Sequence, residues 1–386
     1  MFKRGIKKES FSKNVFLLGP RKVGKSTFLK ATFTDSLYID LLDNSLYDDF
    51  TSNPGSFYQY IQYQLKSNSQ YKNSPIIIDE VQRIPEILHE VHRLIESENI
   101  TFILCGSSAR KLVRGAANML GGRAGRIEMK GLSIDEIPSL DLLKFLNYGG
   151  IPTHYLADDP QTQIRAYVQN YIQEEIKGEA LVRNLKSFNK FLELVGLTNT
   201  EEVNYANIAR DVGVDSKTIK EYFQILIDTL LGTYLEPFFD RQKRTHIRKS
   251  PKFYLFDTGV VNYLKGIQIQ KEIGSEFGKL FEHMIYNEIV NYKNYRSRDF
   301  ALSFWRTYEK DEVDFILGDA EIAVEVKSTG QVSRSDLKGL LKFKSVYGPA
   351  KSIVVSHESI PRSLNSGIDI LPYQEFVKLL WAGQII

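Results

Sequence analysis

One segment limits what this chain can fold into more than any other, Gly19-Pro20-Arg21-Lys22-Val23-Gly24-Lys25-Ser26. It fits the pattern G-x-x-x-x-G-K-[ST] without a gap, follows an apolar run at 15–18 and precedes a helical stretch at 26–31. Glycines at this spacing let backbone N–H groups surround an anion, toward which the helix directs its positive end. We expect Lys25 to reach the β- and γ-phosphates of ATP and Ser26 to bind Mg²⁺, with Thr27 also among the cofactor-binding residues. The alternative is a glycine-rich turn without a ligand.

The residues around this loop predict a parallel sheet. From residue 14 to about 130, amphipathic stretches alternate with short apolar runs at 15–18, 37–39, 76–78 and 100–104. Apolar strands separated by helices are typical of a parallel sheet that is covered on both faces. Prolines at 54 and 85 are expected to open two of these helices. We therefore predict an α/β domain with a phosphate-binding loop over residues 1–150.

Polar residues follow two of the predicted strands. The apolar run at 75–78 ends in Asp79 and Glu80. We expect Asp79 to hold Mg²⁺ or its water and Glu80 to polarise the attacking water, whereas the alternative is two solvated acids at a strand end. The next strand ends at Ser107 and Ser108, and either hydroxyl could sense the γ-phosphate or simply cap a helix.

Two arginines follow within the string GGRAGR. Arg123 and Arg126 could each neutralise transition-state charge, in cis or from a neighbouring subunit of a homo-oligomer. The alternative is that they are ordinary surface residues.

Composition narrows the class of protein further. At roughly 100–200 residues per domain, 386 residues predict two or three domains. No apolar run approaches about 18 residues, so no membrane partner is expected. The charged start MFKRGIKKES lacks the apolar region of a signal peptide, and the single cysteine, Cys105, excludes an intramolecular disulfide. These features predict a cytoplasmic protein.

The middle of the chain, from 160 to 262, has the pattern of a winged helix. Residues 206–219 fit a helix-turn-helix, with Gly213 in the turn and Asp215 or Ser216 capping the second helix. Two strand-like pieces then flank the loop 241–252, which carries six basic residues and no acid. Such a loop can follow the phosphates of DNA, which makes DNA a predicted partner. The alternatives are a solvated loop or a purely structural winged helix.

Near the C-terminus, two strands and a tight turn predict a hairpin with clustered acids. Because side chains alternate along a strand, Glu325 and Lys327 point to one face, and the hairpin can place Asp314 beside Glu325. Two acids that close repel each other unless a divalent metal offsets the repulsion. Glu282, on the apolar face of a helix, is a further candidate. The alternative is a solvent-facing hairpin with one salt bridge and no chemistry.

Taken in order, these motifs resemble bacterial and archaeal ATPases that join an AAA-type domain to a C-terminal DUF4143 domain. The resemblance covers nearly the whole chain and rests on the strings GPRKVGKS, IIIDEVQRIPEIL, LCGSSARKL, GGRAGRIEMKGLSIDEI, YGGIPTHYL, FYLFDTGVVNYL, GKLFEHMIYNEI, WRTYEKDEVDFIL and IAVEVKST. It implies an α/β chain with an AAA/RecA-like parallel-sheet core, a helical winged-helix domain at 160–262, and an α/β domain at 270–386 similar to PD-(D/E)xK restriction endonucleases.

Within that nuclease pattern, the resemblance puts the helix acid on Glu282, the metal aspartate on Asp314 and the E-x-K pair on Glu325 and Lys327. Mg²⁺ or Mn²⁺ is then expected at Asp314 and Glu325. The resulting hypothesis is an Mg²⁺-dependent ATPase whose nucleotide state controls a DNA-directed nuclease. One alternative is an ATP-driven switch whose nuclease-like domain only binds DNA or a protein, and another is a nucleotide-binding scaffold with negligible turnover.

Overall fold

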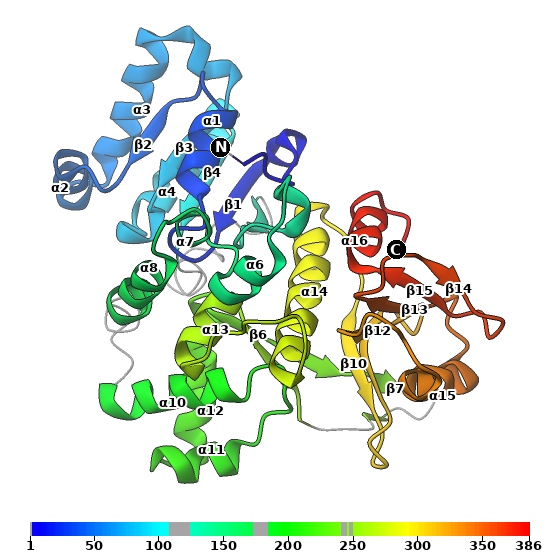
Figure 1. Ribbon diagram of the computed structural model, residues 1–386. Coiled ribbons are helices and arrows are strands. Elements are labelled where there is room, and N and C mark those ends of the chain that lie inside the picture. The colour runs from blue at the N-terminus through cyan, green and yellow to red at the C-terminus, as the bar shows by residue number, and fades with distance from the viewer. Residues whose placement is uncertain (1, 108–123, 173–183, 241–244, 247–249) are drawn as a thin grey trace.

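The structure is a computed structural model that describes residues 2–107, 124–172, 184–240, 245–246 and 250–386. Figure 1 shows an N-terminal sheet with its helices, a group of middle helices, and a C-terminal sheet, with helix α14 (Ser275–Tyr295) at the centre. No helix in the described part of the chain combines the length and apolar character needed to cross a membrane.

The N-terminal sheet has five parallel strands in the order β2-β3-β4-β1-β5. The strands are β1 (Asn14–Leu18), β2 (Tyr38–Asp40), β3 (Ile76–Asp79), β4 (Phe102–Gly106) and β5 (Ala124–Glu128). The four predicted apolar runs are confirmed as β1 to β4. The edge strand β5 was not predicted, because its sequence AGRIE has only one large apolar residue and its exposed face carries charge.

Helices cover both faces of this sheet, as the two-sided apolar strands predicted. They are α1 (Lys25–Thr32), α2 (Asn44–Ser52), α3 (Gly55–Ser67) and α4 (Ile87–Glu98). Alternate strand residues face opposite ways. Ile76 and Ile78 therefore pack in one core with α3 and α4, while Ile77 packs in another with Phe28 of α1.

The middle of the chain is helical. Its helices are α6 (Leu142–Tyr148), α7 (Pro152–Tyr155), α8 (Pro160–Ala166), α10 (Leu185–Leu197), α11 (Tyr205–Val212), α12 (Ser216–Asp228) and α13 (Thr258–Lys265). Helices α11 and α12 form the predicted helix-turn-helix. Gly213 ends α11 with a positive φ of 84°, and the Asp215 side chain caps α12 by accepting from the backbone N–H of Thr218.

The C-terminal sheet has eight strands in the order β14-β15-β13-β12-β11-β10-β6-β9. They are β6 (Gly232–Pro237), β9 (Lys252–Leu255), β10 (Leu302–Arg306), β11 (Glu312–Leu317), β12 (Ile322–Lys327), β13 (Lys351–Ser356), β14 (Arg362–Ser363) and β15 (Asp369–Pro372). Helices α14, α15 (Lys338–Tyr347) and α16 (Tyr373–Trp381) pack against it. A separate short pair joins β7 (Phe239–Asp240) to β8 (Thr245–His246).

The two strands expected to form a wing have a second role in this sheet. Strands β6 and β9 pair antiparallel with each other, and β6 also pairs parallel with β10. The wing strands thus extend the C-terminal sheet instead of standing apart from it. One hydrophobic core also runs from Val15 of β1 through Phe191 and Phe223 of the middle helices to Ile285 of α14 and Val324 of β12. The three regions are therefore packed into one continuous body.

Candidate nucleotide site and C-terminal carboxylate cluster

The loop between β1 and α1 has the tight backbone that phosphate binding requires. A Cβ atom at Gly19 would lie 2.0 Å from the carbonyl oxygen of Met129, and Gly24 has a φ of 95°, so both positions need glycine. The ammonium of Lys25, which is only 6% exposed, donates to the carbonyl oxygens of Gly19 (2.7 Å) and Pro20 (2.9 Å). The lysine therefore lies over the loop, where it can meet an anion held by the loop's N–H groups.

Residues from distant parts of the chain hold the outer side of this loop. Tyr167 donates to the carbonyl oxygen of Arg21 at 3.3 Å, and Arg4 donates to that of Val23 at 2.9 Å. Lys22, between them, has a left-handed φ of 63°. The loop conformation thus depends on the N-terminal segment and on the middle helices as well as on its own glycines.

Asp79, at the end of β3, is buried beside the start of α1. Tyr38 donates a hydrogen bond to its carboxylate. Burial would raise the pKa of Asp79, but hydrogen bonds from Cys105, Tyr38 and Ser26, together with the charge of Lys25, hold that pKa below its ordinary value. An ionised carboxylate in contact with a serine hydroxyl supplies the oxygen ligands that Mg²⁺ takes alongside nucleotide phosphates. This pair of donors fits the Mg²⁺ that accompanies ATP.

Glu80 and Ser107 are joined through a side chain to which the sequence assigned no role. The Gln82 amide donates to the Glu80 carboxylate and, at 3.1 Å, to the Ser107 hydroxyl. Burial raises the pKa of Glu80, and the hydrogen bond from Gln82 counteracts that rise. The next residue, Arg83, does not take part in this link, because its guanidinium donates to the carbonyl oxygen of Leu41 and lies over the ring of Tyr47.

The two predicted arginines have different outcomes. Arg123 lies outside the described residues, as does Ser108. Arg126 lies on β5 and forms an ion pair of 2.6 Å with Glu128 on the same strand. In this arrangement its guanidinium is engaged by a neighbouring acid.

A mostly apolar pocket of about 600 Å³ adjoins the loop. Gly24 and Thr27 form part of its wall. The rest of the wall comes from the N-terminal segment, α1, the segment after β5 and the two ends of α7, and includes Phe2, Ile6, Phe28, Ala31, Leu132, Pro152 and Leu156. A flat aromatic group attached to phosphates on the loop would meet apolar walls here.

The structure brings together all four acids and bases predicted near the C-terminus. Asp314 on β11 accepts a hydrogen bond from the backbone N–H of Val326 on β12 at 2.7 Å. Lys327 forms an ion pair of 2.6 Å with Glu325 on the same face of β12. The electrostatic field of Glu282 on α14 also reaches Asp314. These groups are largely buried, so they form an interior cluster and not a solvated hairpin face.

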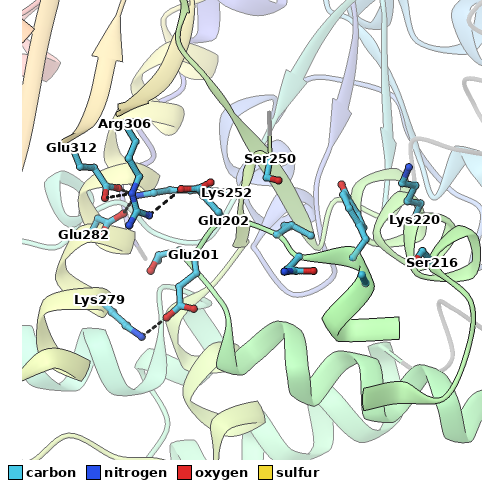
Figure 2. Close-up of a pocket in the computed structure, with 15 residues that line it drawn as sticks. Glu201, Glu202, Ser216, Lys220, Ser250, Lys252, Lys279, Glu282, Arg306 and Glu312 are labelled. Carbon is cyan, nitrogen blue, oxygen red and sulfur yellow. Dashed lines mark hydrogen bonds and ion pairs between the residues drawn. The ribbon is translucent and has the colours of Figure 1, made fainter. Parts of the chain in front are cut away.

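Three further residues extend this cluster, of which Figure 2 shows Lys252 and Glu312 beside Glu282. The Lys252 ammonium, on β9, forms ion pairs with Glu282 at 3.2 Å and with Glu312 at 2.7 Å. Tyr254, two residues further along β9, donates to Glu282 at 2.6 Å. Lys252 was predicted to belong to a phosphate-following loop, but it is 4% exposed and turned inward. Positions 241–244 and 247–249 of that loop lie outside the described residues.

The electrostatics of the cluster reflect close, buried acids. Burial and the neighbouring charges of Glu325 and Glu282 raise the pKa of Asp314 well above its usual range. Burial raises the pKa of Glu325 to about 7, against the opposing effect of Lys327. Within the described residues, no three His, Cys, Asp or Glu side chains form a group that could hold a metal ion. The cluster as arranged does not fit the predicted Mg²⁺ or Mn²⁺.

A cavity of about 930 Å³ separates this cluster from the helix-turn-helix (Figure 2). Ser216 and Lys220, at the start of α12, line one side, and Lys252 and Glu282 line the other. The remaining charged residues on its wall are Glu201, Glu202, Lys279, Arg306 and Glu312. Acids and bases are equally represented and largely paired, so this cavity has no excess positive charge for phosphates.

Fold and site together define an α/β domain with a phosphate-binding loop, a class that binds nucleoside triphosphates. Comparison with protein families agrees with this class for the N-terminal domain. Residues 12–138 match a family described as an AAA domain, which supports the binding and hydrolysis of ATP. Residues 139–271 and 277–376 match two domains of unknown function, DUF8612 and DUF4143. The predicted order of an AAA-type domain followed by DUF4143 is thereby confirmed.

Relatives among known proteins are distant. The chain is 25% identical over 280 residues to uncharacterized proteins of Mycobacterium bovis and Mycobacterium tuberculosis, which covers 70% of this chain. It spans 62% of the length of those two relatives. An uncharacterized protein of Haemophilus influenzae is 24% identical over 383 residues, with 92% of this chain and 91% of that protein covered.

Several side chains at these sites were not found from the sequence, among them Gln82, Arg4 and Lys252. For Lys252 a signal was present, because side chains two apart on a strand share a face, and Lys252 and Tyr254 both contact Glu282 from β9. For Arg4 and Gln82 the sequence holds no such signal, since their partners are far away in the chain or depend on a turn.

Proposed function

We propose that the chain is an Mg²⁺-dependent ATPase. The observation that supports this most is that Lys25, Ser26, Asp79 and Glu80 lie together at one edge of a parallel sheet. They lie beside a loop whose conformation requires glycine at positions 19 and 24. Backbone N–H groups of residues 19–24 would surround the phosphates, and the Lys25 ammonium would pair with them. Mg²⁺, held by Ser26 and Asp79, would neutralise phosphate charge.

The remaining polar residues have distinct tasks in this proposal. Glu80 accepts a proton from the attacking water, which requires its ionised form. Gln82 holds the Glu80 carboxylate in place and links it to Ser107, which senses the γ-phosphate. The base of the nucleotide occupies the apolar pocket beside Gly24 and Thr27, where burial of a flat ring is favourable.

Two variants separate this proposal from a nucleotide-binding scaffold. Lys25→Ala should lose ATP binding, whereas Glu80→Gln should still bind ATP and lose turnover. Binding is measured by calorimetry and turnover by phosphate release, with the exposed Lys66→Ala and Glu98→Gln as matched controls. A wild-type protein that binds ATP without turnover would refute the ATPase and support the scaffold.

The contacts of Arg4 favour a link by which bound nucleotide alters the C-terminal region. Its guanidinium donates to Val23 in the phosphate-binding loop and to the Tyr295 hydroxyl at the end of α14. Helix α14 carries Glu282 of the carboxylate cluster. A shift of the loop on nucleotide binding therefore has a direct route to that helix, as an ATP-driven switch requires.

A second candidate function is DNA binding. The favouring observation is the helix-turn-helix, in which Lys217 and Lys220 at the start of α12 are exposed. Lys217→Ala together with Lys220→Ala should weaken binding of double-stranded DNA and flatten its salt dependence. Fluorescence anisotropy with and without ATP measures both, and unchanged affinity in the double variant would refute this interface.

Metal-dependent DNA cleavage was expected of Asp314, Glu325 and Lys327, which lie close together. Because the cluster as arranged does not fit Mg²⁺ or Mn²⁺, cleavage by the wild-type chain is not part of this proposal. DNA incubated with the wild type and Mg²⁺ or Mn²⁺ should therefore stay intact. Cleavage that Asp314→Ala abolishes while ATP hydrolysis continues would refute this and assign the cluster a nuclease role.

A further inference from the structure

Lys252 is an unusual residue to find among buried acids. Lysine is rarely buried unless it is paired, because removing an ammonium from water is costly. Here the cost is offset by ion pairs with Glu282 and Glu312, and the field of Asp314 adds to them. The ammonium thus lies among three carboxylates that come from α14 and β11.

The Lys252 ammonium lies where a divalent cation would relieve the repulsion between these carboxylates. Carboxylates from different elements repel one another when they are buried together, and a cation between them relieves the repulsion. In many proteins a metal ion has that task. In this chain Lys252 supplies the charge from within the sheet, since β9 pairs with β6 in the same sheet as β11.

We propose that Lys252 is a built-in cation that occupies the place of a divalent metal in the C-terminal carboxylate cluster and thereby excludes one. Removal of the ammonium then leaves Glu282, Asp314 and Glu325 able to bind such an ion. Which cation the cluster holds does not depend on ATP hydrolysis, so this role of Lys252 lies beyond the proposed function.

A second observation points to an unused ligand position. Glu325 is 5% exposed, and its Oε2 atom has no hydrogen-bond partner among the described residues. Its other oxygen is engaged by Lys327. A buried carboxylate oxygen without a partner is costly unless something binds it, and a metal ion at the cluster would do so.

The cavity beside the cluster provides access. Lys252, Glu282 and Glu312 all line the cavity of about 930 Å³ that opens toward the helix-turn-helix (Figure 2). Of the three proposed ligands, Glu282 lines this cavity, so a hydrated ion can reach the cluster at that carboxylate once the ammonium is absent. An entry path of this kind is a requirement for any binding site of an exchangeable metal.

The test is a Mn²⁺ titration of the nucleotide-free full chain by isothermal calorimetry. Lys252→Met should bind one Mn²⁺ at least about ten-fold more tightly than the wild type, and Asp314→Asn in that background should remove the gain. Lys279→Met is the matched control, because Lys279 lines the same cavity but pairs with Glu201. It should bind Mn²⁺ no better than the wild type.

A second variant tests whether the protein still folds, since loss of the lysine removes one ion pair from Glu282 and one from Glu312. Lys252→Met combined with Glu312→Gln removes one of these acids and keeps Glu282, Asp314 and Glu325. This double variant should also gain the Mn²⁺ site and should show higher thermal stability with Mn²⁺ than without.

Two outcomes would overturn the proposal. One is a wild-type protein that already binds Mn²⁺ as tightly as Lys252→Met, with binding lost in Asp314→Asn. The other is a folded double variant, verified by circular dichroism, that binds Mn²⁺ no better than the wild type. ATP hydrolysis is assayed in parallel, and its absence in all variants would count against the ATPase alone.

Discussion

The Gln82 side chain offers a sharp test of the nucleotide site. Its amide donates to both Glu80 and Ser107, so Gln82→Met removes both hydrogen bonds and leaves a side chain of similar length. A hydrogen bond to a charged group contributes about 1.5–3 kcal/mol. If that energy positions Glu80 for catalysis, kcat should fall by roughly 10- to 100-fold while ATP binding changes little.

The pH dependence of turnover gives the second part of this prediction. Burial raises the pKa of Glu80, and the hydrogen bond from Gln82 lowers it. Since Glu80 must be ionised to accept a proton, loss of the bond raises its pKa further. The acid limb of the kcat profile should therefore move to higher pH in Gln82→Met. A merely structural role for Gln82 would not move that limb.

The assay is steady-state phosphate release at saturating ATP across the pH range, with Gln59→Met as control. Gln59 is exposed on α3, so its replacement tests the effect of a methionine in the same domain. The fold should tolerate Gln82→Met, because Gln82 Oε1 has no hydrogen-bond partner within the described residues and methionine removes that unsatisfied group. A kcat and pH profile equal to those of the wild type would refute the positioning role.

Three further predictions concern the framework of the site. Arg4→Met should lower the free energy of unfolding by about 3–5 kcal/mol, because it leaves a buried acid unpaired; a loss below about 1 kcal/mol in urea denaturation would contradict this. Gly19→Ala should lose ATP affinity in calorimetry, since its Cβ would collide with Met129, whereas Gly125→Ala, which meets only ordinary contacts, should keep it. Burial raises the pKa of Glu288 to about 8. Folding therefore takes up a proton between about pH 4.3, the ordinary value, and 8, and the stability from this group falls as pH rises through that window. In Glu288→Gln the free energy of unfolding should fall less steeply with rising pH than in the wild type, by up to about 1.4 kcal/mol per pH unit. The same slope in both proteins between about pH 5 and 8 would show that Glu288 does not titrate there.

Local patterns predicted the elements of this fold well. The two strands predicted for the C-terminal hairpin are β11 and β12, and the helix-turn-helix of α11 and α12 follows its glycine turn and aspartate cap. These features depend on residues close together in the chain, where backbone preference and side-chain periodicity act directly. Strand β5 was missed because an edge strand needs little apolar pattern of its own.

The sequence by itself determined where the phosphate-binding loop lies, since the spacing of its glycines, lysine and serine is local, whereas contacts from Met129, Arg4 and Tyr167 fix its conformation. It also determined which acids could meet at the C-terminal hairpin. Only the tertiary structure decided which cation those acids face. Lys252 is one of six bases in a loop that was predicted to follow phosphates, and the strand face that it shares with Tyr254 does not by itself turn it inward. The pairing of β6 with β10 does so, because it brings β9 into the C-terminal sheet and places its lysine among carboxylates of distant elements.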